Sequence, residues 1–215
     1  MANRYLVAGS LVLGLPALIF TWSRSSYLAF ALGSFLVFWQ RKAMRIFLVM
    51  MLIVIVVIIL LPKPKGEGGN LSRQSTTTAR IANWSKSFEL FTRQPIFGYG
   101  FNTMRYLNLK TGFILPAEFS LNHSAGGLDN SFLFVLATTG VVGFLSYLWL
   151  LQTMVKMGLK ALKKSRQIGL AFVATFLSLV FHSFFQNSLF YPFNLIWMWL
   201  LLASVRKDSG QARMT

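Results

Sequence analysis

The chain has 215 residues, of which 55% are hydrophobic and only 12% are charged, whereas roughly 25% of residues are charged in an ordinary soluble domain. A soluble fold of this length could not bury so much apolar surface in one core, and a chain without cysteine is not a disulfide-stapled secreted domain. The composition therefore excludes a soluble enzyme and a disordered tail. The net charge of +16 would suggest nucleic-acid binding in a soluble protein, but the long apolar runs indicate a membrane protein that binds no nucleic acid.

Five stretches of 16 residues or more contain no Asp, Glu, Lys or Arg. A helix needs about 20 residues to cross a bilayer, with about 17–25 tolerated. The first four stretches fit one crossing each, and the fifth is long enough for two, divided at the polar segment 187–192. We therefore expect an all-α integral membrane protein with six transmembrane helices. The stretches are residues 5–23, 25–40, 46–62, 130–155 and 167–205, and the last yields spans near 168–186 and 193–205.

Basic residues in the short connections predict the orientation of these spans. With six crossings, four basic clusters fall on one side, which the positive-inside rule identifies as cytoplasmic. The first apolar run lacks a small-residue cleavage site, so we expect a retained helix and two cytoplasmic termini. The clusters are Arg4, then Arg41, Lys42 and Arg45, then Lys156, Lys160, Lys163, Lys164 and Arg166, and finally Arg206, Lys207 and Arg213.

This topology divides the chain into four parts. Residues 1–62 carry three spans, residues 63–129 form a long extracytoplasmic loop, residues 130–205 carry three more spans, and residues 206–215 are a cytoplasmic tail. The loop holds eight basic and four acidic residues. A positive surface beside the outer leaflet would attract an anionic substrate such as a lipid-linked diphosphate, although simple solvation of the loop explains the same charges.

The long loop contains one pattern typical of an amphipathic helix, near residues 79–93. Ile81, Trp84, Phe88 and Phe91 fall on one apolar face, and Pro95 ends the pattern. Aromatic residues together with cations suit a helix that lies in the plane of the membrane interface. The following Gly98-Tyr99-Gly100 segment predicts a tight turn, either purely structural or close to a ligand.

Arg24 lies in a short polar segment, residues 23–26, between the first two expected spans. An arginine at this boundary can anchor the chain at the membrane surface by snorkelling. It can also bind phosphate, because the planar guanidinium matches two phosphate oxygens. The residues alone leave both interpretations open.

Asp129 and Asn130 stand at the outer mouth of the fourth span, and His123 precedes them in the loop. A carboxylate or a neutral histidine at this place could act as general base toward a sugar hydroxyl. Asp129 and Asn130 also suit the N-cap of the following helix. Capping and chemistry do not exclude each other.

His182 and Gln186 lie four positions apart in the fifth span and share one helical face. Polar groups in a span usually face the interior of the bundle, where they either join helices or contact substrate. The sequence has no P-loop, no paired Cys/His spacing, no HExxH and no GxSxG. We therefore expect neither an ATP-driven pump nor a zinc or serine hydrolase, and no metal or cofactor.

Several of these segments, in this order and spacing, resemble the O-antigen ligase/polymerase family. The resemblance covers roughly residues 20–150 and corresponds to the carboxy-terminal half of the larger family members. The segments that carry it are Thr21-Trp22-Ser23-Arg24, Ala79-Arg80 with Asn83-Trp84, residues 94–102 with Pro95 and Gly98-Tyr99-Gly100, Asp129-Asn130-Ser131-Phe132-Leu133, and residues 138–144.

The resemblance implies an enzyme of the bacterial inner membrane. Members of the family transfer a glycan from an undecaprenyl-diphosphate carrier to a glycan, lipid or protein acceptor on the outer face of that membrane. Carried over, the family pattern suggests Arg24 and Arg80 as ligands of the diphosphate. Asn130, Trp84, His182 and Gln186 are further candidates for contact with substrate. The family has a histidine where this chain has Asp129, so either Asp129 or His123 is expected to serve as the catalytic base.

Two other functions stay open at this stage. A carrier or channel for a small anion could use the basic loop as a funnel, with His182 and Gln186 near its path. The short chain could also be a fragment or a noncatalytic half-enzyme that needs a partner chain.

Overall fold

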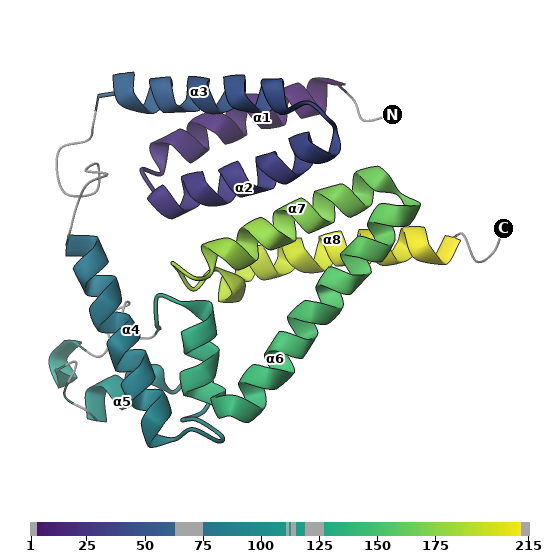
Figure 1. Ribbon diagram of the computed structural model, residues 1–215. Coiled ribbons are helices and arrows are strands. Elements are labelled where there is room, and N and C mark those ends of the chain that lie inside the picture. Colours follow the sequence, from purple (N-terminus) through teal and green to yellow (C-terminus); the bar gives the residue numbers. More distant parts are fainter. Residues whose placement is uncertain (1–3, 63–74, 111, 113–114, 119–126, 212–215) are drawn as a thin grey trace. The chain divides into compact units, whose positions relative to one another are not determined.

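The computed structural model describes residues 4–62, 75–110, 112, 115–118 and 127–211 and is shown in Figure 1. These residues form eight α-helices and two short 3-10 helices, with no strand among them. The described part of the chain is therefore all-helical, as the sequence predicts. The chain divides into two compact units, Met1–Gln74 and Ser75–Thr215.

The first unit is built from three helices of 17 residues each, α1 (Arg4–Phe20), α2 (Arg24–Gln40) and α3 (Met44–Leu60). Ser23 is the N-cap of α2, and its Oγ accepts a hydrogen bond from the Ser26 N–H at 3.3 Å. The Tyr27 hydroxyl donates to the Ile19 carbonyl at 2.7 Å and ties α2 to the end of α1. The turn that carries Arg24 is thus held by its own side chains.

Helix α3 exposes large apolar side chains along its whole length, from Ile46 to Leu60, and only Val54 is buried. A helix that is apolar all round, yet not covered by protein, suits contact with lipid. Helix α2 packs beside α3 through aromatic rings, with the Phe35 and Phe47 centroids 5.9 Å apart. The exposed surface of this unit is therefore of the kind expected for membrane helices.

The second unit contains the remaining helices, α4 (Ser75–Arg93), α5 (Met104–Lys110), α6 (Ser131–Lys164), α7 (Arg166–His182) and α8 (Pro192–Gln211). Helices α7 and α8 lie side by side and pack on the long α6 (Figure 1). Buried apolar side chains from all three form one core, whose largest members are Leu151, Met154, Phe172, Phe176 and Met198.

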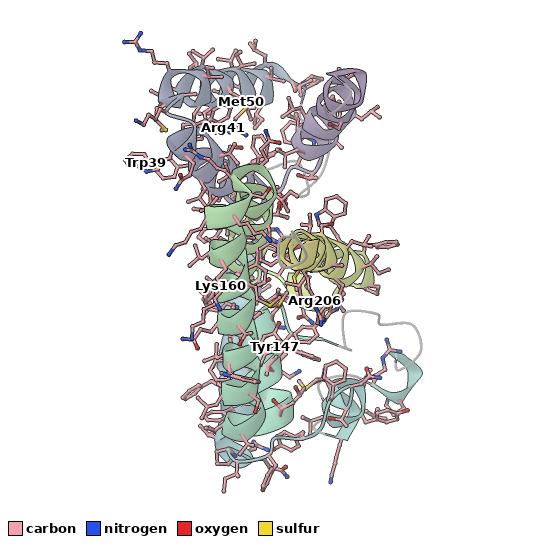
Figure 2. The ribbon with its side chains drawn as sticks, turned by 90° about the vertical axis from the view of Figure 1, so that its right-hand side faces the viewer. Trp39, Arg41, Met50, Tyr147, Lys160 and Arg206 are labelled. Atoms are coloured by element: carbon pink, nitrogen blue, oxygen red, sulfur yellow. The ribbon has the colours of Figure 1, made fainter. Side chains whose placement is uncertain are left out.

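The two ends of this three-helix group differ in chemistry. Near the ends of α6 and α8, the buried Ala161 and Val205 belong to one core cluster. Their neighbours in sequence, Lys160 and Arg206, therefore lie at the same end of the group (Figure 2). The opposite end carries the start of α6 and the end of α7. The last two basic clusters thus lie at one end of the group, and the side of a membrane that this end faces stays a prediction.

Helix α6 is interrupted at Gly140, whose φ of 63° and ψ of −167° are accessible essentially to glycine alone. The segment 95–100, just after α4, fills the interruption and satisfies backbone groups that the break frees. Gly98 also has a positive φ of 65°, and a Cβ there would lie 2.5 Å from the Thr138 carbonyl carbon. The hydrogen bonds run from Tyr99 N–H to Ala137 O, Gly100 N–H to Thr138 O, Val141 N–H to Pro95 O and Val142 N–H to Ile96 O.

The expected span 130–155 is therefore not one uninterrupted helix, and this corrects the sequence analysis. Apolar composition marks the segment as a span but does not report the backbone angles of one glycine. The helix also continues to Lys164, because charged residues end an apolar run without ending a helix. Helix α7 ends at His182, four residues before the predicted limit of 186.

Among the described residues, one helix is long and apolar enough to cross a membrane, namely Ser131–Lys164. Three shorter apolar helices accompany it: Met44–Leu60, Arg166–His182 and Pro192–Arg206. Each of the six predicted spans overlaps one helix of the structure, and four of them extend beyond that helix at one end. Six crossings of the membrane stay a prediction.

Replacing Gly140 with alanine should strongly destabilise the second unit. The new Cβ would lie 2.2 Å from the Ile96 carbonyl oxygen, and alanine cannot adopt this backbone conformation without strain. We expect a loss of about 3 kcal/mol or more, combining strain and overpacking, seen as a lower thermal unfolding temperature of the detergent-purified protein. The matched control is Gly127→Ala, since a Cβ there meets nothing within 4 Å. Equal stability of the two variants would contradict this account of the break.

Candidate functional site

Polar side chains from three separate segments gather where α6 begins and α7 ends. Helix α4 supplies Arg80 and Asn83, the start of α6 supplies Asn130 and Ser131, and the connection from α7 to α8 supplies the third group. This connection contains the short 3-10 helix Ser188–Phe190 and begins at His182. The following contacts show how these segments are joined.

Asn130 caps α6 and also binds the end of α7. Its Oδ1 accepts hydrogen bonds from the Phe132 and Leu133 N–H groups at 2.8 and 3.1 Å. Its Nδ2 donates to the Phe184 carbonyl at 2.9 Å. The side chain is buried, at 6% exposure, so both halves of its amide are used inside the protein. The N-cap role predicted for Asn130 is thus present in the structure.

Ser131 strengthens the same junction. Its N–H donates to the Ser183 carbonyl at 3.0 Å, and its Oγ accepts from the Leu189 N–H at 3.3 Å. The Ser131 Oγ also donates to the Gln186 carbonyl at 3.5 Å. Ser131 is fully buried, so these bonds form away from water and hold the α7–α8 connection against α6.

Asn83 connects the loop helix to the same place. Its Oδ1 accepts a hydrogen bond from the Asp129 N–H at 3.1 Å, across 46 positions of sequence. The Asn83 carbonyl in turn accepts from the Ser87 hydroxyl at 2.6 Å. Asp129 itself is exposed, while the hydrogen bond to Asn83 holds its backbone. A role for its carboxylate in catalysis stays a prediction.

His182 pairs with Ser188 at this site. The His182 Nδ1 lies 2.5 Å from the Ser188 Oγ, and the Arg80 guanidinium is near enough for its charge to act on the His182 imidazole. The Ser188 carbonyl accepts from the Asn194 Nδ2 at 2.8 Å, which fixes the serine from the side of α8. The fold thus places a cation from the long loop next to a polar pair at the end of α7.

Asn187 adds a buried polar atom to this region. Its Oδ1 is buried and has no hydrogen-bond partner within the described ranges. A buried amide oxygen without a partner is costly in a folded protein, so such groups deserve a functional explanation. It lies next to Ser188 in sequence and therefore close to the His182 pair.

Arg24 belongs to the other unit, where it is the first residue of α2. Backbone N–H groups at the start of a helix favour an anion, and Arg24 adds a positive charge at that start. The meeting of Arg24 and Arg80 stays a prediction, as does any role for either residue in catalysis.

The other predicted residues fall in different places. His123 lies outside the described residues. Trp84 lies on α4 with 36% of its surface exposed. Gln186 is half-buried, and its backbone carbonyl is the atom that contacts Ser131. In the part of the chain that the structure describes, no group of three His, Cys, Asp or Glu side chains could hold a metal ion.

The sequence analysis assigned no individual role to the residues that join the segments, Asn83, Ser131 and Ser188, although the first two lie in the segments that resemble the family. Asn83 follows Arg80 by one helical turn, and Ser188 lies in the polar break after His182, so both positions carried a local signal. Their partners lie far away in the sequence, however, and only the fold identifies them.

A comparison with protein families gives one match. The family described as O-Antigen ligase matches residues 9–148, which is well over half of the chain. The match includes Arg24, Arg80 and Asp129 but ends before His182. A comparison with curated individual proteins gives no significant match.

Substitutions at Asn130 should separate the contribution of its N-cap from that of its hydrogen bond to Phe184. Asn130→Ala loses both the cap and the donor to Phe184, and we expect a loss of about 2 kcal/mol. Asn130→Asp keeps the cap acceptor but loses the donor, and we expect a loss of about 1 kcal/mol. Thermal unfolding of the purified protein measures both values. A variant Asn130→Ala as stable as the unmodified protein would show that these bonds contribute nothing.

Proposed function

The chain belongs to the O-antigen ligase family, and on that premise we propose that it is a membrane glycosyltransferase of bacterial surface polysaccharide assembly. In this proposal it transfers a glycan from an undecaprenyl-diphosphate carrier to a hydroxyl group of a glycan, lipid or protein acceptor. The observation that carries the proposal is the convergence of Arg80, the Asn83-anchored Asp129 and His182 at one end of the second unit. Two of these three residues lie within the family match.

Arg80 would bind the diphosphate of the carrier, with Arg24 as its second ligand. A guanidinium forms paired hydrogen bonds with phosphate oxygens and keeps its charge at all relevant pH values. When the glycosyl bond breaks, negative charge grows on the departing diphosphate. A cation placed there stabilises the transition state more than the ground state, which is the condition for catalysis.

The transfer needs one base and no redox partner. The acceptor oxygen attacks the anomeric carbon, the bond from that carbon to the diphosphate oxygen breaks, and the electron pair leaves with the diphosphate. The proton of the acceptor hydroxyl passes to a base, for which Asp129 and His123 are the candidates. The exposure of Asp129 and the hydrogen bond that fixes its backbone support the first candidate.

The membrane arrangement belongs to the same proposal. Six helices would cross the bacterial inner membrane, with residues 63–129 outside and both termini in the cytoplasm. The exposed apolar surface of α3 and the apolar length of α6 support contact with lipid. The exposed Ile81, Trp84 and Phe88 on α4 support a helix lying at the outer interface.

Replacing Arg80 with alanine should reduce glycan transfer by about a hundredfold or more, since loss of one donor to a developing anion has roughly this effect in other enzymes. Arg80→Lys should retain part of the activity, because the charge remains but the paired hydrogen bonds do not. The measurement is transfer in cells that supply the lipid-linked donor, with the amount of protein in the membrane quantified in parallel.

The control for charge is Arg105→Ala. This variant also removes one cation from the predicted loop, but the residue lies on α5 and not on α4, so transfer should be normal. Normal transfer by the Arg80→Ala variant, at normal membrane abundance, would refute the assignment of the diphosphate site.

Single engineered cysteines test the predicted topology, and the natural sequence contains none that would interfere. In intact cells, an impermeant thiol reagent should label Arg24→Cys and Arg80→Cys. It should label Lys42→Cys and Lys160→Cys only after the membrane is permeabilised. Protection of position 24 or 80 in intact cells would place that residue on the cytoplasmic side and exclude the joint diphosphate site.

A further inference from the structure

A charged cavity lies between α4 and α5, and neither Arg80 nor His182 lines it. Its volume is about 480 Å³, within the range of roughly 300–1,000 Å³ that is usual for small-molecule sites. Helix α4 lines one side and α5 lines the other. The side chains that matter here are Lys86, Glu89, Arg93, Tyr99, Leu107 and Lys110.

The α4 residues that line the cavity come from the second half of the helix. Lys86, Glu89 and Arg93 line it, whereas Arg80 and Asn83, nearer the start of the helix, do not. A ligand in the cavity therefore contacts a different set of side chains from those of the proposed diphosphate site.

The charges of the cavity favour an anion. Three cations face one carboxylate, that of Glu89, which pairs with Arg93 at 2.5 Å. More than half of each paired side chain is exposed, so this ion pair is weak and Arg93 can exchange its partner for a ligand at little cost. Burial lowers the pKa of the Lys86 ammonium, and the charge of Glu89 partly offsets this effect. A partly buried ammonium gains from a further anionic partner.

The cavity also offers an apolar and aromatic surface. Tyr99 lies in the segment that fills the α6 break, so its backbone is fixed by the hydrogen bond to Ala137. Leu107 adds an aliphatic surface from α5. Aromatic and aliphatic side chains beside a few charged groups form a site for a compact ligand with both an apolar face and a charge. A sugar ring that carries an acidic group has these two properties.

We propose that the cavity between α4 and α5 binds an acidic sugar residue, through Lys86, Arg93 and Lys110 on the acidic group and Tyr99 against the ring. The identification as a sugar, rather than another small anion, rests on the proposed function. In this proposal the cavity binds an acidic sugar of the glycan other than the one whose glycosyl bond reacts. The protein would therefore prefer glycans that contain acidic sugars as substrates.

Binding of trigalacturonate to the full-length protein in phosphatidylcholine nanodiscs tests this proposal without any transfer reaction. We expect the trisaccharide to bind, and the neutral maltotriose to bind at least tenfold more weakly, because one charge-assisted contact is worth roughly this factor. Lys110→Gln and Lys86→Gln should each weaken trigalacturonate binding about three- to tenfold. The matched control is Arg105→Gln, which removes a cation from the same short helix without touching the cavity, and it should bind normally.

Three results would overturn the proposal. They are equal binding of maltotriose, an equal loss in Arg105→Gln and Lys110→Gln, and binding of inorganic phosphate as tight as that of the trisaccharide. Displacement of the trisaccharide when phosphatidylglycerol replaces phosphatidylcholine would assign the cavity to a lipid headgroup instead, and so would also refute it.

The test also separates this inference from the proposed function. Arg80→Ala should lose transfer and keep its affinity for trigalacturonate. If the unmodified protein binds the trisaccharide but transfers no glycan, the assignment of the cavity stands and the proposed function is refuted. If it transfers glycan but does not bind the acidic trisaccharide, the proposed function stands and the assignment of the cavity is refuted.

Discussion

The insertion of residues 95–100 into the break in α6 is the contact on which the second unit depends. A helix interrupted within an apolar segment leaves amide and carbonyl groups without partners, and in a membrane such groups are tolerated only when protein satisfies them. The inserted segment does so, and it can approach closely because neither Gly98 nor Gly140 has a side chain. The end of α4 is thereby fixed to α6. The positions of Arg80 and Asn83 follow from that attachment.

A second set of hydrogen bonds closes the opposite side of the site. Asn130 and Ser131 join the start of α6 to the connection between α7 and α8, and every one of these bonds uses a buried or half-buried group. Hydrogen bonds of this kind are directional, whereas apolar packing alone tolerates sliding of one helix along another. They therefore set the register between α6 and α7, which brings His182 toward Arg80.

Helix α4 separates two charged regions with different properties. Its first half carries Arg80 and Asn83 toward the polar end of the three-helix group, and its second half carries Lys86 and Arg93 toward the cavity beside α5. The same helix exposes Ile81 and Phe88. Under the proposed function, α4 would contact a diphosphate, a sugar chain and the membrane surface through these three groups of side chains.

The helical class, the apolar segments and the end of the loop helix before Pro95 follow from the order of residues alone, because they depend on neighbouring residues and their periodicity. Asp129 and His182 could also be singled out as polar groups beside or within apolar segments, whereas Arg80 became a candidate through the family resemblance. The contacts of Asn83 with Asp129 and of Ser188 with His182, and the break of α6 at Gly140, were known only once the chain was folded. The physical reason is sequence distance: Asn83 and Asp129 are 46 positions apart, and Asn130 and Phe184 are 54 apart. A contact between such residues is set by the packing of whole helices, which no local pattern records.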